Sequence, residues 1–210
     1  MDSRLIPNLI DVSLCLVALF ISVRSFDVYA QFRQLRLFIL GLSMVIVSLS
    51  AAADFTASYV RAIALHTDWF LYIGQAVGFL FILLSLLQSS DTYLRALMRL
   101  NILAFPFLLL LLLLSPVLPD IPNTLTRALL GGARCLICFM IFFAYFSAFT
   151  SKPTRFSLLM SASFFLLSVG YLMTLEHSFA PSLTQYLFND LGDITGVIGL
   201  VALVAAVSWE

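Results

Sequence analysis

Residues 100–119 decide the fold: LNILAFPFLLLLLLLSPVLP lies between Arg99 and Asp120 and contains no charged side chain. A helix of about 20 mostly apolar residues is long enough to cross the hydrocarbon core of a bilayer. The whole chain has the same character, because 62% of its 210 residues are hydrophobic and only 10% are charged. A soluble domain is roughly 45–50% apolar and about 25% charged. The sequence therefore indicates an integral membrane protein, and it argues against a soluble enzyme, a nucleic-acid-binding protein or a disulfide-stabilised secreted module.

Charged residues divide the chain into seven apolar segments, and none of these shows strand-type alternation. We therefore predict an all-α integral membrane protein in which a seven-transmembrane helix bundle forms one domain over residues 1–210. The predicted spans are residues 5–23, 37–53, 69–90, 100–119, 128–151, 156–175 and 189–209. The longest connections, around residues 25–36 and 177–188, are too short for a folded soluble domain. We expect either a complete membrane body or a chain that continues into an output domain.

Basic residues are unevenly distributed between the two sets of connections. Seven flank the connections between spans 1–2, 3–4 and 5–6: Arg24, Arg33, Arg36, Arg95, Arg99, Lys152 and Arg155. Three flank the opposite ends: Arg4, Arg61 and Arg127. Short loops rich in Lys and Arg stay in the cytoplasm. The sequence thus predicts an external N-terminus, a cytoplasmic C-terminus and a multi-pass protein of a cell membrane, such as the bacterial inner membrane.

One arginine, Arg134, lies inside a predicted span, about 10 Å inward from Arg127 at the helical rise of 1.5 Å per residue. A charge at such a depth costs about 2.5–3.5 kcal/mol on insertion scales and marks a functional site by default. Polar residues expected in the same outer half of the membrane are Asn8, Asp11, Asp54, Gln75, Asp190 and Asp193. Two interpretations stay open. The group forms a buried ion-pair network that fixes helix packing, or it lines an outward-facing pocket for a small polar ligand or an ion.

The remaining motifs argue against redox, metal or cofactor chemistry. Cys135 and Cys138 have the spacing of a reactive pair, but both fall inside a span and are interpreted as small buried hydrophobes. The two histidines fall in predicted outer connections, so we expect no metal site, no cofactor and no enzymatic activity. Small residues at helical spacing predict close helix packing in the third and seventh spans. They are Gly74 and Gly78, and Gly192, Gly196, Gly199, Ala202, Ala205 and Ala206.

Three basic turns resemble one another at a spacing of roughly 62–65 residues, at residues 22–29, 87–95 and 149–156. This similarity indicates either three repeated helical hairpins or the shared composition of cytoplasmic turns. The overall plan is similar to the membrane-embedded sensor modules of bacterial signalling proteins, a resemblance of architecture that carries no residues. It implies a sensory or transducing domain, with a downstream cytoplasmic output domain as partner. The alternatives are a non-catalytic subunit packed against other membrane subunits, and a transporter of small solutes or lipids.

Overall fold

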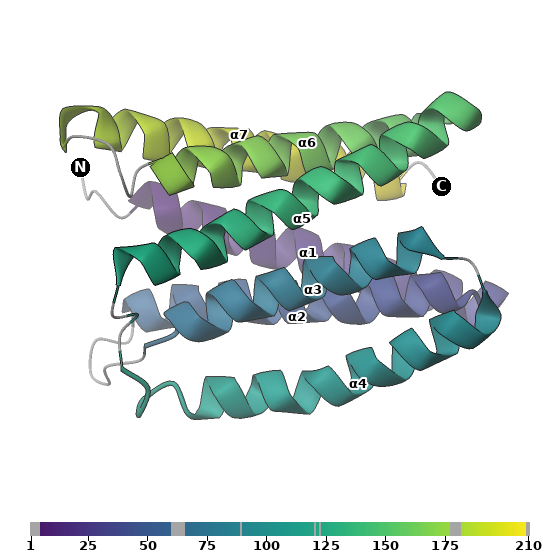
Figure 1. Ribbon diagram of the computed structural model, residues 1–210, viewed down its shortest axis with the longest axis horizontal. Helices are drawn as coiled ribbons and strands as arrows, with labels where there is room; N and C mark the ends of the chain where they lie inside the picture. The colour runs from purple at the N-terminus through teal and green to yellow at the C-terminus, as the bar shows by residue number, and fades with distance from the viewer. Residues whose placement is uncertain are drawn as a thin grey trace. The chain divides into compact units, whose positions relative to one another are not determined.

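Seven α-helices make up the part of the chain that the computed structural model describes, which is residues 5–59, 66–88, 90–119, 121, 123–176 and 182–208 (Figure 1). They are α1 (Leu5–Phe32), α2 (Leu35–Tyr59), α3 (Asp68–Leu87), α4 (Asp91–Leu113), α5 (Thr124–Ser151), α6 (Arg155–Glu176) and α7 (Ser182–Ser208). Within these residues there is no strand, and six helices are long and apolar enough to cross a membrane. The described part of α7 contributes a shorter apolar run, Ile194–Ser208. The fold is that of a multi-pass, all-helical membrane protein.

The helices extend beyond the predicted spans at several ends. The connection predicted around residues 25–36 is wrong, because α1 continues to Phe32 and only two residues separate it from α2. Similarly, α4 begins nine residues before the predicted span and ends at Leu113, after which the chain turns. The predicted ends were placed at charged residues. A helix is held by backbone hydrogen bonds, however, and long basic side chains on its surface can reach water from inside it.

The turn between α1 and α2 is tight because Arg33 adopts the left-handed conformation, with φ at 56°. Its amide donates to the carbonyl of Tyr29 at 2.8 Å, which closes the end of α1. For a residue other than glycine this conformation costs roughly 1–2 kcal/mol. Packing across the hairpin offsets the cost, since Phe38 makes edge contacts with Phe26 and Tyr29 at ring-centroid distances of 5.6 and 5.3 Å.

The chain divides into two compact units, each of which is described by itself. The first, here called the four-helix unit, comprises Leu14–Asp120; the second, the C-terminal unit, comprises Ile121–Glu210 together with Met1–Ser13. That all seven helices pack as a single domain stays a prediction.

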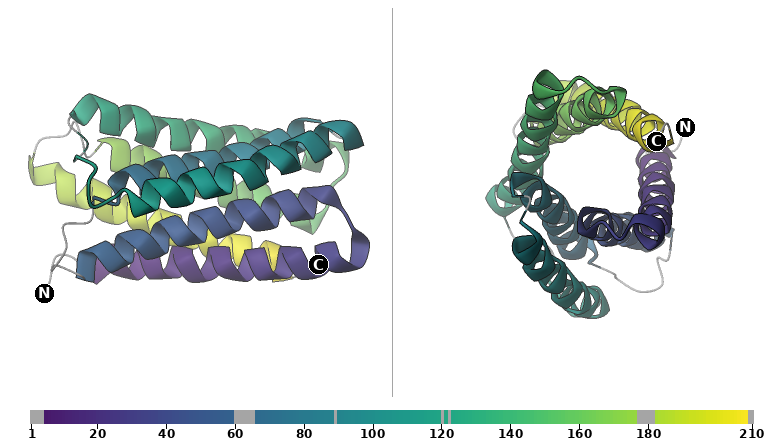
Figure 2. Two further views of the ribbon diagram at one scale, coloured as in Figure 1. Left: turned by 90° about the horizontal axis from the view of Figure 1, so that it is seen from below. Right: turned by 90° about the vertical axis from the view of Figure 1, so that its right-hand side faces the viewer.

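In the four-helix unit, α2 is the central element and packs against α3 and α4 (Figure 1). One apolar cluster joins the three helices through Ile46, Phe70 and Leu108, and a second joins Ile39 of α2 to Leu94 and Leu97 of α4. The turn from α1 to α2 and the turn from α3 to α4 lie at the same end of this unit, as Figure 2 shows.

In the C-terminal unit, α6 lies between α5 and α7 in the packing order and contacts both. The contact with α7 is close because it is made by glycines. A Cβ atom added to Gly170 would lie 2.8 Å from the carbonyl oxygen of Gly192, and one added to Gly199 would lie 3.1 Å from that of Ser163. Gly196, in contrast, has no such neighbour within 4 Å. The close packing predicted for the seventh span is confirmed at Gly192 and Gly199.

The same cysteine–serine contact occurs in both units. In the four-helix unit, the Ser48 hydroxyl donates to the backbone carbonyl of Cys15 at 3.0 Å, and the Cys15 Sγ lies 3.4 Å from Ser48 Oγ. In the C-terminal unit, the Ser168 hydroxyl donates to the carbonyl of Cys135 at 3.1 Å, with Sγ and Oγ 3.5 Å apart. Both pairs are 33 residues apart in sequence. The α1–α2 and α5–α6 hairpins are thus joined by equivalent contacts, 120 residues apart.

A second equivalent contact joins α3 to α2 in one unit and α7 to α6 in the other. A Cβ atom on Gly78 of α3 would lie 3.0 Å from the carbonyl oxygen of Ser43 of α2, and one on Gly199 of α7 would lie 3.1 Å from that of Ser163 of α6. Ser43 and Ser163 are again 120 residues apart and both are fully buried, whereas Gly78 and Gly199 are 121 residues apart. These contacts match α1–α2–α3 with α5–α6–α7, and α4 follows the first group and precedes the second in the sequence. Their period differs from the spacing of 62–65 residues noted for the basic turns.

Candidate functional site

Arg134 lies on the inner face of α5 in the C-terminal unit, where only 7% of its surface is exposed. Its guanidinium carbon lies 4.8 Å from the centroid of the Tyr171 ring on α6. Gly131, one turn earlier, lies beside the guanidinium, and a Cβ atom added there would be in ordinary van der Waals contact with Nη2 at 4.0 Å. A cation over an aromatic face is stabilised by about 0.5–1 kcal/mol at exposed sites and by 2 or more when it is desolvated. The charge predicted inside this span is therefore held between two helices.

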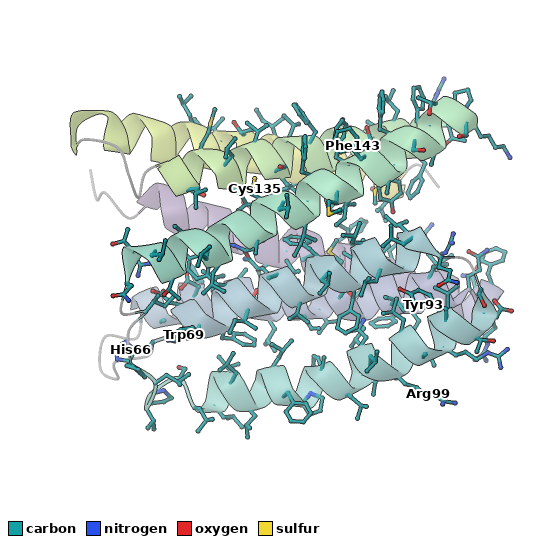
Figure 3. The ribbon with its side chains drawn as sticks, in the orientation of Figure 1. His66, Trp69, Tyr93, Arg99, Cys135 and Phe143 are labelled. Atoms are coloured by element: carbon teal, nitrogen blue, oxygen red, sulfur yellow. The ribbon has the colours of Figure 1, made fainter. Side chains whose placement is uncertain are left out.

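Hydrogen bonds next to Arg134 fix the register between α5 and α6. Cys135 follows Arg134 directly, and its thiol donates to the backbone carbonyl of Ser168 at 3.3 Å while the Ser168 hydroxyl returns a bond to the carbonyl of Cys135. Tyr171 is three residues after Ser168, so it projects from the same face of α6. The cysteine labelled in Figure 3 therefore has a structural role beside the charged group. Cys138 is fully buried, as expected of a small hydrophobe.

Four of the predicted site residues belong to helices of the C-terminal unit, but their side chains lie outside the described residues. They are Asn8 and Asp11 on α1, and Asp190 and Asp193 on α7. Their pairing with Arg134 stays a prediction.

The other two, Asp54 and Gln75, belong to the four-helix unit. Asp54 accepts a hydrogen bond at 3.2 Å from the hydroxyl of Thr67, which is 4% exposed and precedes α3. Nearby, the indole of Trp69 donates to the carbonyl of Pro119 at 2.9 Å. These bonds tie the last turns of α2 and the segment that follows α4 to the start of α3, at the end of the unit where Figure 3 labels His66 and Trp69. Gln75 is 2% exposed on α3.

Sequence reasoning missed a further buried polar residue, Asn101, which is fully enclosed in the four-helix unit. Its amide nitrogen donates to the carbonyl of Ile39 at 3.3 Å and to the hydroxyl of Ser43 at 3.2 Å. Its Oδ1 atom is buried without a hydrogen-bond partner among the described residues. The signal was present in the sequence, because Asn101 is the only amide side chain in the apolar stretch 100–119. Tyr171 was missed as well, and its role is visible only once α5 and α6 are paired.

Comparison of the chain with protein-family models, with curated proteins and with solved structures finds no match. Among the described residues, no group of three or more His, Cys, Asp or Glu side chains is placed to hold a metal ion. A guanidinium carries five N–H donors, which suit it to hydrogen bonds with anionic groups.

Proposed function

We propose that the chain is a sensory or transducing membrane domain that binds a small anionic or zwitterionic solute at Arg134 and transmits this event to α7. In this proposal the chain crosses the membrane seven times, with its N-terminus outside and its C-terminus in the cytoplasm. The observation that carries the proposal is the stacking of the buried Arg134 on Tyr171. Ionisable residues inside transmembrane segments usually serve function, and they require compensation that a bound anion can supply or share.

The route to α7 follows from the packing around Tyr171. The preceding residue, Gly170, has its α-carbon so close to α7 that a Cβ atom would lie 2.8 Å from the carbonyl oxygen of Gly192. A solute that draws the guanidinium away from the Tyr171 ring changes the contact between α5 and α6. Because α6 and α7 touch backbone to backbone at this level, a shift of α6 is passed to α7. Interfaces packed in this way respond by discrete shifts of whole helices.

The test uses the full chain in lipid nanodiscs, with spin labels on Leu172→Cys of α6 and Val201→Cys of α7. Both positions are exposed in the unit, at 47% and 63%. The native cysteines are replaced by Cys15→Ser, Cys135→Ser and Cys138→Ala in the background chain. The probes are acetate, succinate, glycine and glutamate. We expect at least one probe to shift the distance between the labels, and Arg134→Gln to abolish that shift.

The control variants are Arg134→Lys, which retains the charge but loses the planar group, and Tyr171→Phe, which retains the ring. Tyr171→Phe should respond as the parent does, and Arg134→Lys should respond with reduced affinity. A chain that is insensitive to every probe, and equally stable with Arg134→Gln, would contradict the proposal. A chain that is insensitive but unfolds with Arg134→Gln would identify Arg134 as a structural group.

A second candidate function, transport of a small solute, is favoured by the equivalent contacts of α1–α2–α3 and α5–α6–α7. Several classes of secondary transporter are built from repeats of the same orientation. Uptake of the same radiolabelled probes into proteoliposomes separates the two functions. Uptake that depends on Arg134 supports a transporter, whereas a label shift without uptake supports a sensor.

A further inference from the structure

A cleft of about 560 Å³ opens at the end of the four-helix unit where α2 and α4 begin. This volume falls in the range of roughly 300–1,000 Å³ that is typical of ligand sites. The α1–α2 turn and the first turn of α4 line the cleft through residues 33–36, Asp91, Leu94 and Arg95. Hereafter these residues are called the basic cleft. Three arginines and one aspartate give it a formal charge of plus two.

The arginines of the basic cleft are available for a ligand. Arg33, Arg36 and Arg95 are all exposed, and none of their guanidinium groups forms an ion pair or hydrogen bond with another described residue. The ion pair that the described residues do form in the neighbouring part of α1, between Arg24 and Asp27, lies outside the cleft. Arg33 is also held in the left-handed conformation, with φ at 56°, although glycine or asparagine would be less strained there. The backbone at this position therefore does not itself favour arginine.

Two helix N-termini add to the field of the arginines. Helices α2 and α4 begin at Leu35 and Asp91, and both residues line the cleft. The first turn of a helix presents amide groups without helical partners and a positive partial charge, so anions bind there. The combination of three guanidinium groups with two helix ends fits a phosphate ester, because its oxygens accept hydrogen bonds from guanidinium forks and from the free amides of helix N-termini.

The floor of the cleft favours a lipid over a soluble anion. Leu35 and Leu94 belong to or pack on the apolar cluster of Ile39, Leu94 and Leu97, which continues along α2 and α4 into their apolar segments. A molecule in the cleft therefore has charged groups beside its head and apolar side chains below. Basic pockets between transmembrane helices at the cytoplasmic surface bind anionic lipid headgroups.

We infer that the basic cleft binds the phosphodiester headgroup of an anionic membrane lipid. The headgroup phosphate lies among Arg33, Arg36 and Arg95, and the acyl chains descend along Leu35 and Leu94. The carboxylate of Asp91 repels the phosphate and so lowers the affinity of the cleft for the headgroup. The inference is independent of the solute proposed for Arg134, which belongs to the other unit.

The experiment measures the association of spin-labelled phosphatidylglycerol with the full chain reconstituted in phosphatidylcholine bilayers, relative to spin-labelled phosphatidylcholine. Each arginine near an anionic lipid surface contributes about fivefold in affinity. We therefore expect Arg33→Asn, Arg36→Gln and Arg95→Gln each to lower the preference for phosphatidylglycerol about fivefold, and the triple variant to abolish it. Asparagine is chosen at position 33 because it tolerates the left-handed conformation.

The matched control is Arg99→Gln, one turn after Arg95 on α4. Arg99 is exposed, does not line the cleft, and points away from α2 and α3 in Figure 3. Arg99→Gln should lower the preference much less than Arg95→Gln does, and Asp91→Asn should raise it. Equal losses with Arg99→Gln and Arg95→Gln would overturn the inference in favour of general surface charge. Displacement of the lipid by millimolar inorganic phosphate or glycerol 3-phosphate would overturn the lipid as the ligand.

Discussion

The Tyr171 ring stabilises the positive charge of Arg134, which the apolar residues around it on α5 cannot solvate. A guanidinium inside an apolar segment loses its water, and an aromatic face replaces part of that stabilisation without introducing an opposite charge. The planar group is essential to this geometry, since it can stack on the ring while its N–H groups point to the side. The contact therefore holds α5 to α6.

A double-mutant cycle on this pair should reveal a coupling of about 0.5–2 kcal/mol in the free energy of unfolding. The cycle combines Arg134→Gln with Tyr171→Leu, because glutamine removes the cation while leucine removes the aromatic face. The measurement is reversible unfolding in mixed detergent micelles by circular dichroism. Additive losses from the two substitutions would show that the ring does not stabilise the cation.

Asn101 should prove nearly dispensable for stability. Asn101→Leu loses two hydrogen bonds, which inside membrane proteins contribute on average about 0.6 kcal/mol each. It also removes the buried Oδ1 atom, which has no partner among the described residues. We expect a change of less than about 1 kcal/mol in the same unfolding measurement, whereas Asn101→Asp should cost about 3 kcal/mol because it buries a charge. A large loss with Asn101→Leu would show that the amide organises the unit.

At the scale of single residues, the sequence predicted Arg134 as a site residue but did not predict that Tyr171 contacts it. A charge inside an apolar segment is conspicuous by composition alone, whereas Tyr171 is an ordinary residue of a membrane helix. Its contact depends on the register between α5 and α6, which the bonds between Cys135 and Ser168 set. A polar contact across two helices cannot be derived from either helix separately.

At the scale of the elements, the distance between α6 and α7 is set by glycine. Gly170→Ala should destabilise the chain by about 1–3 kcal/mol, the usual cost of overpacking, because its Cβ would lie 2.8 Å from the carbonyl oxygen of Gly192. Gly196→Ala is the matched control on the facing helix, where nothing lies within 4 Å, and should be neutral or slightly stabilising. Thermal unfolding in nanodiscs measures both. Equal effects of the two substitutions would refute the close contact between these helices.

The sequence predicted the existence of these elements better than their ends. Six apolar segments of sufficient length became helices that can cross a membrane, but Leu94 and Leu97 of α4 fell before the predicted span. They are buried although Arg95 lies between them. The predicted span was made to begin after Arg99 because that residue is charged. The helix nevertheless begins earlier, because one face of its first turns packs against protein while the other face carries the arginines to solvent.

At the scale of the molecule, the two groups of three helices should respond alike to equivalent changes. Gly78→Ala and Gly199→Ala each place a methyl group 3.0–3.1 Å from the backbone carbonyl of Ser43 or Ser163. We expect the two losses of unfolding free energy to agree within about 0.5 kcal/mol. Gly74→Ala provides the control, since its nearest contact of 3.4 Å is an ordinary van der Waals distance. A loss confined to one of the two would show that the equivalent contacts differ in energy.

The orientation of the chain in the membrane decides which compartment supplies the solute proposed for Arg134 and which leaflet supplies the lipid proposed for the basic cleft. Seven basic residues flank one set of connections and three the other, so Ser90 is predicted in the cytoplasm and Asn123 outside. Both residues are exposed helix caps whose side chains make no capping hydrogen bond, and cysteine at either position should leave the fold intact.

A membrane-impermeant maleimide added to right-side-out vesicles should therefore label Asn123→Cys at once, and Ser90→Cys only after the vesicles are permeabilised. The unmodified chain is the control for the native cysteines, of which Cys138 is fully buried and the other two half-buried. Labelling of Ser90→Cys from outside, with Asn123→Cys protected, would reverse the orientation and place the basic cleft at the outer leaflet. Labelling of both from one side would contradict a membrane-spanning α4, since Ser90 precedes α4 and Asn123 lies in the connection that follows it.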